Sequence, residues 1–594
     1  MSGCDITDRV PENAITDLNY WGKVDDLRMY ARNLYSQLPG PVGGSRYPDE
    51  SKTDIVVEAV PSDYLLDAFT VPTDDNGWAY ADWSPIRNCN YFLTHYQTVV
   101  GDEQEIKHYV GEVRFFRALL YFNKVKDFGD VPWYETDLQT SDQAELTKPR
   151  DPRLTVIANI KADLEYAITN MKKPSDVMSG QLHKDAALAL LARVMLYEGT
   201  WQKYRNASPT VWQPLLESAA ATAKRIMDGE NGKTYEITKG TAPYTVSGYP
   251  LNYKAKFIQA NKSNDPECIL ARIYSDETGV MHGLSRITSK GLSKDFVDQF
   301  LCTDGLPISI STSYMGDDSI NSELENRDPR LRNILDCKYN PFILAGGTVS
   351  VNNPLLPTSV TEVETVTGYR SIKYREPDNI EPNKTAYDWY VFRYAEILLI
   401  YAEALAELGG EARCTQTVVD ETINKLRERL DESSLTMARM SIASLQDDPM
   451  EQYNGQYRYG YDLSKLLYEI RRERTVELAF DGFRWDDICR WKAGALFNNP
   501  KSMCGIVINA DVRARYAAAA GGTDPFASAN LLSSTEQLAG VSATRDLLRA
   551  YSSGVEDRHV WNDRNYLRPL PKNQILLNPN LTQNCGWDGG SACP

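Results

Sequence analysis

The sequence of 594 residues has no long apolar run and no excess of basic charge. No window approaches the roughly 18 apolar residues that a membrane-spanning helix needs, so we predict no such helix. Lys and Arg total 64 against 81 Asp and Glu, which gives a formal net charge of −17. Binding to nucleic acid through its phosphates needs clustered Lys and Arg, so this class of partner is disfavoured.

Motifs for catalysis and metal binding are also missing. The five histidines are scattered without a His-x-x-x-His pair, and the ten cysteines contain no Cys-x-x-Cys. No Gly-x-Ser-x-Gly occurs, and Gly346-Gly347 does not join a strand to a helix as a phosphate loop does. We therefore predict no metal, no cofactor and no nucleotide or acyl-transfer chemistry. Only Cys585 and Cys593 are close enough along the chain to form a disulfide easily.

The aromatic residues are unusual in kind, because 35 Tyr and 11 Trp outnumber 15 Phe by about three to one. Tyr and Trp combine an apolar ring face with a polar edge, which suits sugar rings and hydrated interfaces. Packing between helices is the simpler explanation for most of them.

Apolar residues at helical spacing predict pairs of helices, and hence a mainly α fold with long irregular loops and a few short strands. One pair covers 184–197 and 215–227, and another covers 392–408 and 418–430. A unit of about thirty residues resembles a tetratricopeptide hairpin. Further helices are expected over 112–126 and 466–480, where Gly or Pro follows each end.

The sequence also predicts which face of one helix is exposed to solvent and which segments carry the ligand contacts. Glu396, Glu403 and Glu407 fall on one face of the helix expected over 392–408, which favours a solvated stripe. The segments 230–390 and 500–560 are rich in Gly, Pro, Asn and Tyr and show no sustained period. Long ordered loops on a helical scaffold usually carry the function, so we expect ligand contacts there.

A helical glycoside hydrolase is the main enzymatic alternative. It would need two carboxylates on opposite sides of a glycosidic bond, one with a raised pKa. Asp486 and Asp487 are candidates, but they lie in the Arg-rich segment 484–490. Ion pairing there would lower the carboxylate pKa values, so we predict that the chain is not an enzyme.

The N-terminus reads Met-Ser-Gly-Cys, and Ser-Gly-Cys is the pattern at the processing site of a bacterial lipoprotein signal. This predicts that Cys4 is the lipidated first residue of the mature protein. An ordinary free cysteine in a terminal segment is the alternative. A lipid on a leader over residues 1–20 would tether the protein to a membrane without burying its surface.

Together these segments resemble the SusD/RagB family. The first match is 111–122, with the sequence Gly-Glu-Val-Arg-Phe-Phe-Arg-Ala-Leu-Leu-Tyr-Phe, followed by Phe-Gly-Asp-Val-Pro. Later matches include Arg-Asp-Pro-Arg-Leu at 327–331 and Phe-Arg-Tyr-Ala-Glu-Ile-Leu-Leu at 392–399. Arg-Glu-Arg-Thr-Val-Glu-Leu-Ala-Phe-Asp-Gly-Phe-Arg-Trp at 472–485 and Tyr-Leu-Arg-Pro-Leu-Pro at 566–571 follow, and Asn-Pro-Asn-Leu-Thr-Gln-Asn-Cys-Gly-Trp at 578–587 is the last match. The matches keep the family's order along almost the whole chain.

The resemblance implies a single helical domain over 21–594, with an N-terminal part to about 230 and a C-terminal part from about 260. It implies a non-catalytic lipoprotein on the outer face of an outer membrane, anchored through its lipid. Such a protein captures glycan and delivers it to a TonB-dependent, SusC-like transporter. Peptide binding, as in the RagB branch, is the alternative. Arg117, Arg393 and Glu477 are expected to pair within the scaffold, because a charge between helices needs a partner.

Ligand contacts in this family come from variable loops, so composition has to indicate them. Sugar binding needs aromatic faces together with planar amide, carboxylate or guanidinium groups. The predicted ligand-binding residues are Arg46, Tyr47, Asp49, Asp54, Tyr64, Asp67, Trp78, Trp83, Tyr274, His282, Arg370 and Tyr374. For Trp78 and Trp83, packing in the core is the preferred alternative.

Overall fold

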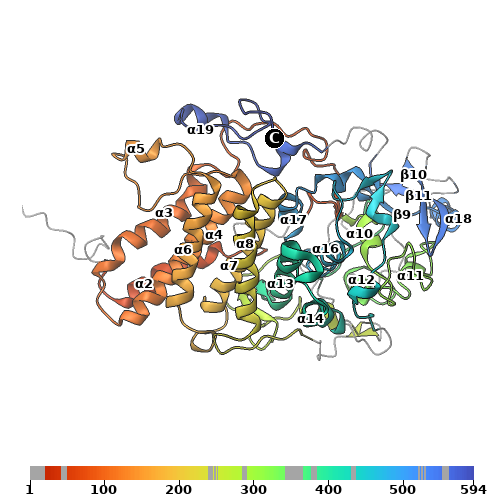
Figure 1. Cartoon of the computed structure of the whole chain (residues 1–594), viewed down its shortest axis with the longest axis horizontal. Coiled ribbons are helices and arrows are strands. Elements are labelled where there is room, and N and C mark those ends of the chain that lie inside the picture. Colours follow the sequence, from red (N-terminus) through yellow and green to blue (C-terminus); the bar gives the residue numbers. More distant parts are fainter. Residues whose placement is uncertain are drawn as a thin grey trace, which may run out of the picture.

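The structure is a computed structural model, shown in Figure 1. It describes residues 20–41, 50–238, 245–246, 249–250, 252–283, 290–340, 365–375, 384–429, 436–519, 522, 526, 530–551 and 561–593. The predicted leader and Cys4 lie outside these residues, as do Arg46, Tyr47 and Asp49.

The N-terminal half forms a layer of long helices, at the left of Figure 1. They are α2 (Val24–Asn33), α3 (Tyr80–His95), α4 (Glu103–Phe128), α6 (Arg153–Asn170), α7 (Lys184–Lys203) and α8 (Pro209–Met227). Consecutive long helices pack as pairs, α4 on α6 and α7 on α8. Gly199 allows the close approach within the second pair, because a Cβ there would lie 2.7 Å from Cδ2 of Leu216.

The central part of the chain continues this layer. Helix α13 (Tyr394–Gly409) packs on α8, α7 and α16 (Lys465–Glu477), and α17 (Arg484–Arg490) packs on α7. The predicted helices are found at the expected positions, although 392–393 belong to the strand that leads into α13 and 478–480 follow the end of α16. The stretch expected as a single helix over 418–430 divides into α14 (Gln416–Glu421) and α15 (Ile423–Glu428), because Thr422 leaves the helical conformation at φ −125° and ψ −86°.

Strands are few, and most are short. Strand β4 (Cys268–Arg272) pairs antiparallel with β6 (Trp389–Arg393), and β6 leads directly into α13. A three-stranded antiparallel sheet joins β10 (Leu531–Leu538), β11 (Val541–Arg549) and β9 (Cys504–Val507), at the right of Figure 1. The remaining strands are two-residue pairs: β1 (Val56–Val57) with β5 (Gly291–Leu292), β2 (Thr245–Val246) with β3 (Tyr249–Pro250), and β7 (Gln452–Tyr453) with β8 (Gln456–Tyr457). The mainly α fold class is therefore confirmed.

Shorter helices complete the fold. They are α5 (Gln143–Leu146), α9 (Asn252–Ala255), α10 (Lys294–Gln299), α11 (Ile320–Glu323), α12 (Pro329–Ile334), α18 (Ala510–Ala519) and α19 (Lys572–Leu577). The largest apolar core cluster includes residues from Trp21 to Leu581. The division of the chain into a leader and one domain over 21–594 stays a prediction.

The glutamate face of α13 corrects the expectation of a solvated stripe. Glu396, Glu403 and Glu407 are 1%, 0% and 3% exposed. Glu396 pairs with Arg193 at 2.6 Å, and Glu403 pairs with Arg490 at 2.6 Å. The face packs against α7, α16 and α17 instead of water, and each buried carboxylate has a cationic partner because an unpaired one would be very costly.

The expected scaffold pairs are confirmed. Arg117 contacts Asp163 at 2.7 Å, and Arg393 contacts Glu477 at 2.6 Å. Cys585 and Cys593 form a disulfide, as their spacing suggested. Within the described ranges, no helix combines the length and the apolar character required to cross a membrane.

Candidate functional site

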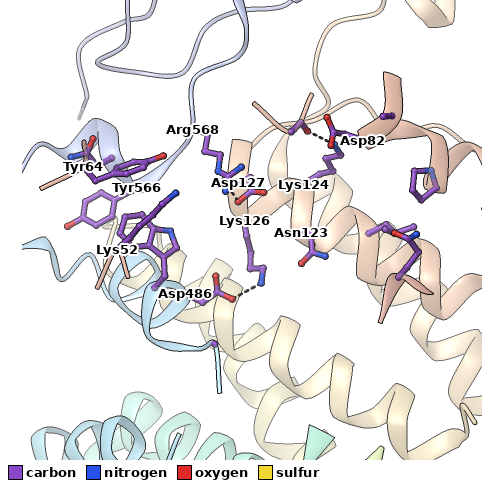
Figure 2. A pocket seen from close by; sticks show the side chains of 18 residues that line it. Lys52, Tyr64, Asp82, Asn123, Lys124, Lys126, Asp127, Asp486, Tyr566 and Arg568 are labelled. Carbon is purple, nitrogen blue, oxygen red and sulfur yellow. Dashed lines mark hydrogen bonds and ion pairs between the residues drawn. The ribbon is translucent and has the colours of Figure 1, made fainter. Parts of the chain in front are cut away.

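A cleft of about 490 Å³ lies between the N-terminal helices and the C-terminal loop, and 18 of the described residues line it (Figure 2). Its volume falls in the range typical of small-molecule sites, about 300–1,000 Å³. The lining comes from the segment before α3, from α3 and α4, from the start of α17 and from 565–568. Neither of the long aperiodic segments, 230–390 and 500–560, contributes to this lining.

Aromatic rings form one wall of the cleft. Tyr64, Trp485 and Tyr566 line it, and the rings of Tyr64 and Trp485 meet edge to face at 5.5 Å. Figure 2 shows Tyr64 and Tyr566 at the same end of the cleft, with Lys52 beside them. Tyr566 is fixed because its hydroxyl accepts a hydrogen bond from the Gly494 amide at 2.8 Å.

A buried carboxylate fixes the turn that leads to Trp485. Glu50 is 3% exposed and accepts hydrogen bonds from the backbone amides of Phe480 at 3.0 Å and Gly482 at 3.1 Å. Gly482 has φ +87°, a conformation that favours glycine. Burial raises the pKa of Glu50 to about 7, although the backbone amides act in the opposite direction.

The amide of Asn565 is the most unusual polar group in the cleft. Its residue is 2% exposed, and neither Oδ1 nor Nδ2 has a hydrogen-bond partner in the part of the chain that the structure describes. By contrast, the Asn584 amide, also buried, donates to the Phe128 and Arg568 carbonyls and accepts from Arg150. A primary amide presents a donor and an acceptor side by side, which matches neighbouring hydroxyls of a sugar.

Charged groups line the opposite wall, as Figure 2 shows. Lys126 pairs with Asp486 at 2.6 Å. Lys124 is 7% exposed and donates to the Gly77 carbonyl at 2.5 Å. Burial lowers the pKa of Lys124 to about 8, against the opposing effect of nearby Asp82. These groups can bind hydroxyls or anions.

Among the predicted ligand residues that are described, Tyr64 lines the cleft. Asp54 is fully buried and contacts Arg484 through two hydrogen bonds of 2.7 Å. Asp67 pairs with Arg564 at 2.8 Å outside the cleft. The ligand role expected of Asp54 does not match this placement, because both of its carboxylate oxygens bind Arg484 and the residue does not line the cleft.

Trp78 and Trp83 pack behind the cleft. Their rings meet edge to face at 5.2 Å, and Trp78 also contacts Phe128 at 4.8 Å. Trp78 is 4% exposed, and neither indole lines the cleft. This placement agrees with the core-packing alternative.

The four predicted residues from the long loops are buried away from the cleft. Tyr274 and His282 are 3% and 0% exposed and pack edge to face at 4.7 Å. Arg370 pairs with Asp336 at 2.9 Å, and Tyr374 donates to Asp481 at 2.7 Å. Burial lowers the pKa of His282 to about 4. Their expected ligand role does not match these positions, because the loops fold inward and use their aromatic rings for packing.

Sequence reasoning missed most of the cleft lining. Trp485, Tyr566 and Arg568 lie in motifs that were interpreted as scaffold, and Lys124 lies in a helix predicted to be structural. The available signal was the joint occurrence of Tyr, Trp and Arg in these motifs. Asn565 gave no signal, because its lack of partners depends on the folded surroundings.

The carboxylates considered for hydrolysis are held in ion pairs. Asp487 contacts Arg474 at 2.9 Å and Arg490 at 2.8 Å, and Asp486 contacts Lys126. Over the described ranges, no group of three or more His, Cys, Asp or Glu side chains could hold a metal ion.

Comparison with known proteins gives consistent matches. The profile of the SusD family matches residues 259–587, more than half of the chain. A second profile, described as starch-binding associating with outer membrane, matches residues 48–196. SusD-like protein P2 of Formosa agariphila is 24% identical over 71% of this chain and 73% of its own length. SusD-like protein P38 of the same organism is 23% identical over 82% of this chain and 88% of its own length.

Solved structures show the same fold. A SusD-like protein of Bacteroides fragilis superposes with a TM-score of 0.67 at 23% identity, covering 96% of this chain and 99% of that protein. A SusD-like carbohydrate-binding protein of the same species has a TM-score of 0.65 at 21% identity, covering 94% and 99%.

Proposed function

Because this chain belongs to the SusD family, we propose that it captures glycan at the outer surface of the outer membrane and delivers it to a TonB-dependent, SusC-like transporter. The glycan occupies the cleft, and a lipid on Cys4 holds the protein on the membrane. The protein catalyses no reaction on the glycan.

The observation that carries this proposal is the combination of aromatic rings with an unpartnered amide in one cleft. The rings of Tyr64, Trp485 and Tyr566 offer apolar faces to the C–H side of a sugar. Asn565 offers a donor and an acceptor that the rest of the described chain leaves unused. A buried amide without partners costs free energy, which a hydrogen-bonded ligand recovers.

A binding role without catalysis is supported by the state of the acidic groups. A glycosidase needs one carboxyl as acid and a second as nucleophile or base. In the cleft, Asp486 pairs with Lys126, and Asp82 accepts a hydrogen bond from the Ala79 amide at 2.9 Å. The third carboxylate of the described lining, Asp127, lies 3.6 Å from Nε of Arg568, so all three carboxylates have partners within the protein.

The test is calorimetric titration with a panel of oligosaccharides, comparing the parent with Trp485→Ala. Loss of a stacking ring should weaken binding by about tenfold or more, since about 1.4 kcal/mol is a factor of ten. Trp212→Ala is the matched control, because Trp212 is half-buried on α8 and does not line the cleft. A folded parent that binds no glycan refutes this function. A Trp485→Ala variant that binds glycan as tightly as the parent does refutes the placement of the site.

The anchor and the partner need separate measurements. Cys4→Ala should release the protein from the membrane fraction of cells that lack the transporter. Mild detergent extraction and affinity purification of the native protein should recover the transporter with it. A membrane-bound Cys4→Ala protein, or recovery of the protein alone while the transporter is expressed, would contradict these parts of the proposal.

A further inference from the structure

We infer that the cleft selects an acidic glycan, whose carboxylate or sulfate group contacts both Lys124 and Arg568. This inference rests on the proposed glycan-binding function and specifies the class of glycan.

The charge of the lining is the first observation. Lys52, Lys124, Lys126 and Arg568 face the carboxylates of Asp82, Asp127 and Asp486, so the described part of the lining has a formal charge of +1. The whole chain has a formal charge of −17. A positive cleft in an acidic protein attracts an anionic ligand and is screened less than charges on an open surface.

The second observation is that each of these three carboxylates has a partner inside the protein. Asp486 pairs with Lys126 at 2.6 Å. Asp82 accepts from the Ala79 amide at the start of α3. Asp127 lies 3.6 Å from Nε of Arg568. These contacts reduce the repulsion that the carboxylates would exert on an incoming anion.

The third observation concerns the contacts of the buried side chain of Lys124. Its ammonium group forms no ion pair with a carboxylate in the described part of the chain, and it donates to the Gly77 carbonyl. The Trp83 ring lies 4.8 Å from Nζ. Burying a cation without a carboxylate costs free energy, and an anion in the cleft offsets that cost.

Arg568 completes the anion site. Its side chain is 36% exposed, and Figure 2 shows it on the other side of Asp127 from Lys124. A guanidinium group binds carboxylate or sulfate oxygens through paired N–H groups. The neighbouring rings of Tyr64 and Trp485 favour an anion carried on a sugar over a free inorganic ion.

The site should couple binding to protonation. The charged groups that act on Lys124 are Asp82 from α3, Asp127 from α4, Arg568 from the C-terminal loop and Asp75 from the loop before α3. Since burial lowers the pKa of Lys124 to about 8, the ammonium form declines above that pH. An anion prefers the ammonium form, so affinity should fall by about tenfold between pH 7 and pH 9.

The experiment uses matched pairs of oligosaccharides and the full chain. One pair is a uronic-acid oligosaccharide and its carboxyl-reduced form, and the other is a sulfated oligosaccharide and its desulfated form. Binding is measured by calorimetry for the parent, Lys124→Gln and Arg568→Gln. Lys107→Gln is the control, because Lys107 is a partly exposed residue of α4 outside the cleft.

We expect the parent to bind one acidic form at least tenfold more tightly than its neutral counterpart, and the preferred pair identifies the anion. Arg568→Gln and Lys124→Gln should each remove most of this preference, while Lys107→Gln keeps it. A parent that prefers neutral forms overturns the inference but leaves glycan binding intact. An acidic preference that both cleft variants retain also overturns it. A parent that binds no glycan in either form refutes the proposed function as well.

Discussion

Replacing Asn565 by Leu should stabilise the free protein while it weakens glycan binding. The amide of Asn565 is buried, and both of its polar atoms lack partners in the described structure. Leu has a similar shape and no polar atoms, so the substitution removes a desolvation cost and keeps the packing. Ligand binding loses a donor and an acceptor.

The magnitude follows from the number of unpaired groups. Leaving one buried polar group unsatisfied costs about 1–3 kcal/mol, and local relaxation reduces the gain, so we expect about 1–2 kcal/mol of added stability. Unfolding entropy scales with chain length at about 2 cal/mol/K per residue, so the melting temperature should rise by about 1–2 °C. Glycan affinity should fall by about tenfold or more.

The assay is differential scanning calorimetry combined with isothermal titration of the glycan. Asn584→Leu is the matched control, because the Asn584 amide donates to two carbonyls and accepts from Arg150. That control should lower the melting temperature. If Asn565→Leu lowers it as well and leaves glycan affinity unchanged, Asn565 is a structural residue and the reasoning is refuted.

Three further predictions concern the scaffold. Gly199→Ala should cost about 1–3 kcal/mol of unfolding free energy, because the added Cβ would meet Leu216; an unchanged urea midpoint would contradict this. Arg484→Met should cost about 3–5 kcal/mol, because it removes both hydrogen bonds to the buried Asp54 carboxylate and leaves, among the described residues, only Arg458 near it, at 4.0 Å; adding Asp54→Leu should restore most of that stability, and equal stability of the single and double variants would refute this account. Because burial raises the pKa of Glu50 to about 7, the folded state holds a proton on this carboxyl more tightly than the unfolded state does. The resulting contribution to stability is complete below pH 4.5, the ordinary pKa of Glu, and is lost as the pH rises through 7. Urea unfolding of Glu50→Gln should therefore lose less stability from pH 5 to pH 8 than the parent, by about 2–3 kcal/mol; identical pH profiles would argue against this.

Helical periodicity predicted the scaffold well because it reports a property of each helix alone. The apolar stretch over 184–197 lies within α7, and Gly129 and Gly410 follow the ends of α4 and α13. The same periodicity gave a wrong prediction of solvent exposure for Glu403, because it shows which residues share a helix face but not what packs against that face. The face is buried against basic side chains from three other helices.

The site was harder to predict than the fold. Tyr274, Arg370 and Tyr374 have the composition expected of a sugar site, yet they are buried away from the cleft. Composition does not distinguish a ring that binds ligand from one that packs in the interior. Whether the Asn565 amide has hydrogen-bond partners depends on which groups surround it after folding. Only the folded structure reveals that the described residues offer it none.

The cleft is assembled from parts of the chain that are far apart in sequence, and this links ligand binding to the order of folding. Asp54 and Arg484, whose ion pair supports the wall that bears Trp485, are separated by 430 residues. The lining itself runs from Gln37 to Arg568. Loops this long must close before the contacts can stabilise the fold, so we expect these contacts to form late in folding. The proposed glycan binding therefore requires nearly the entire chain to be folded, and a chain truncated before residue 568 would lack part of the site.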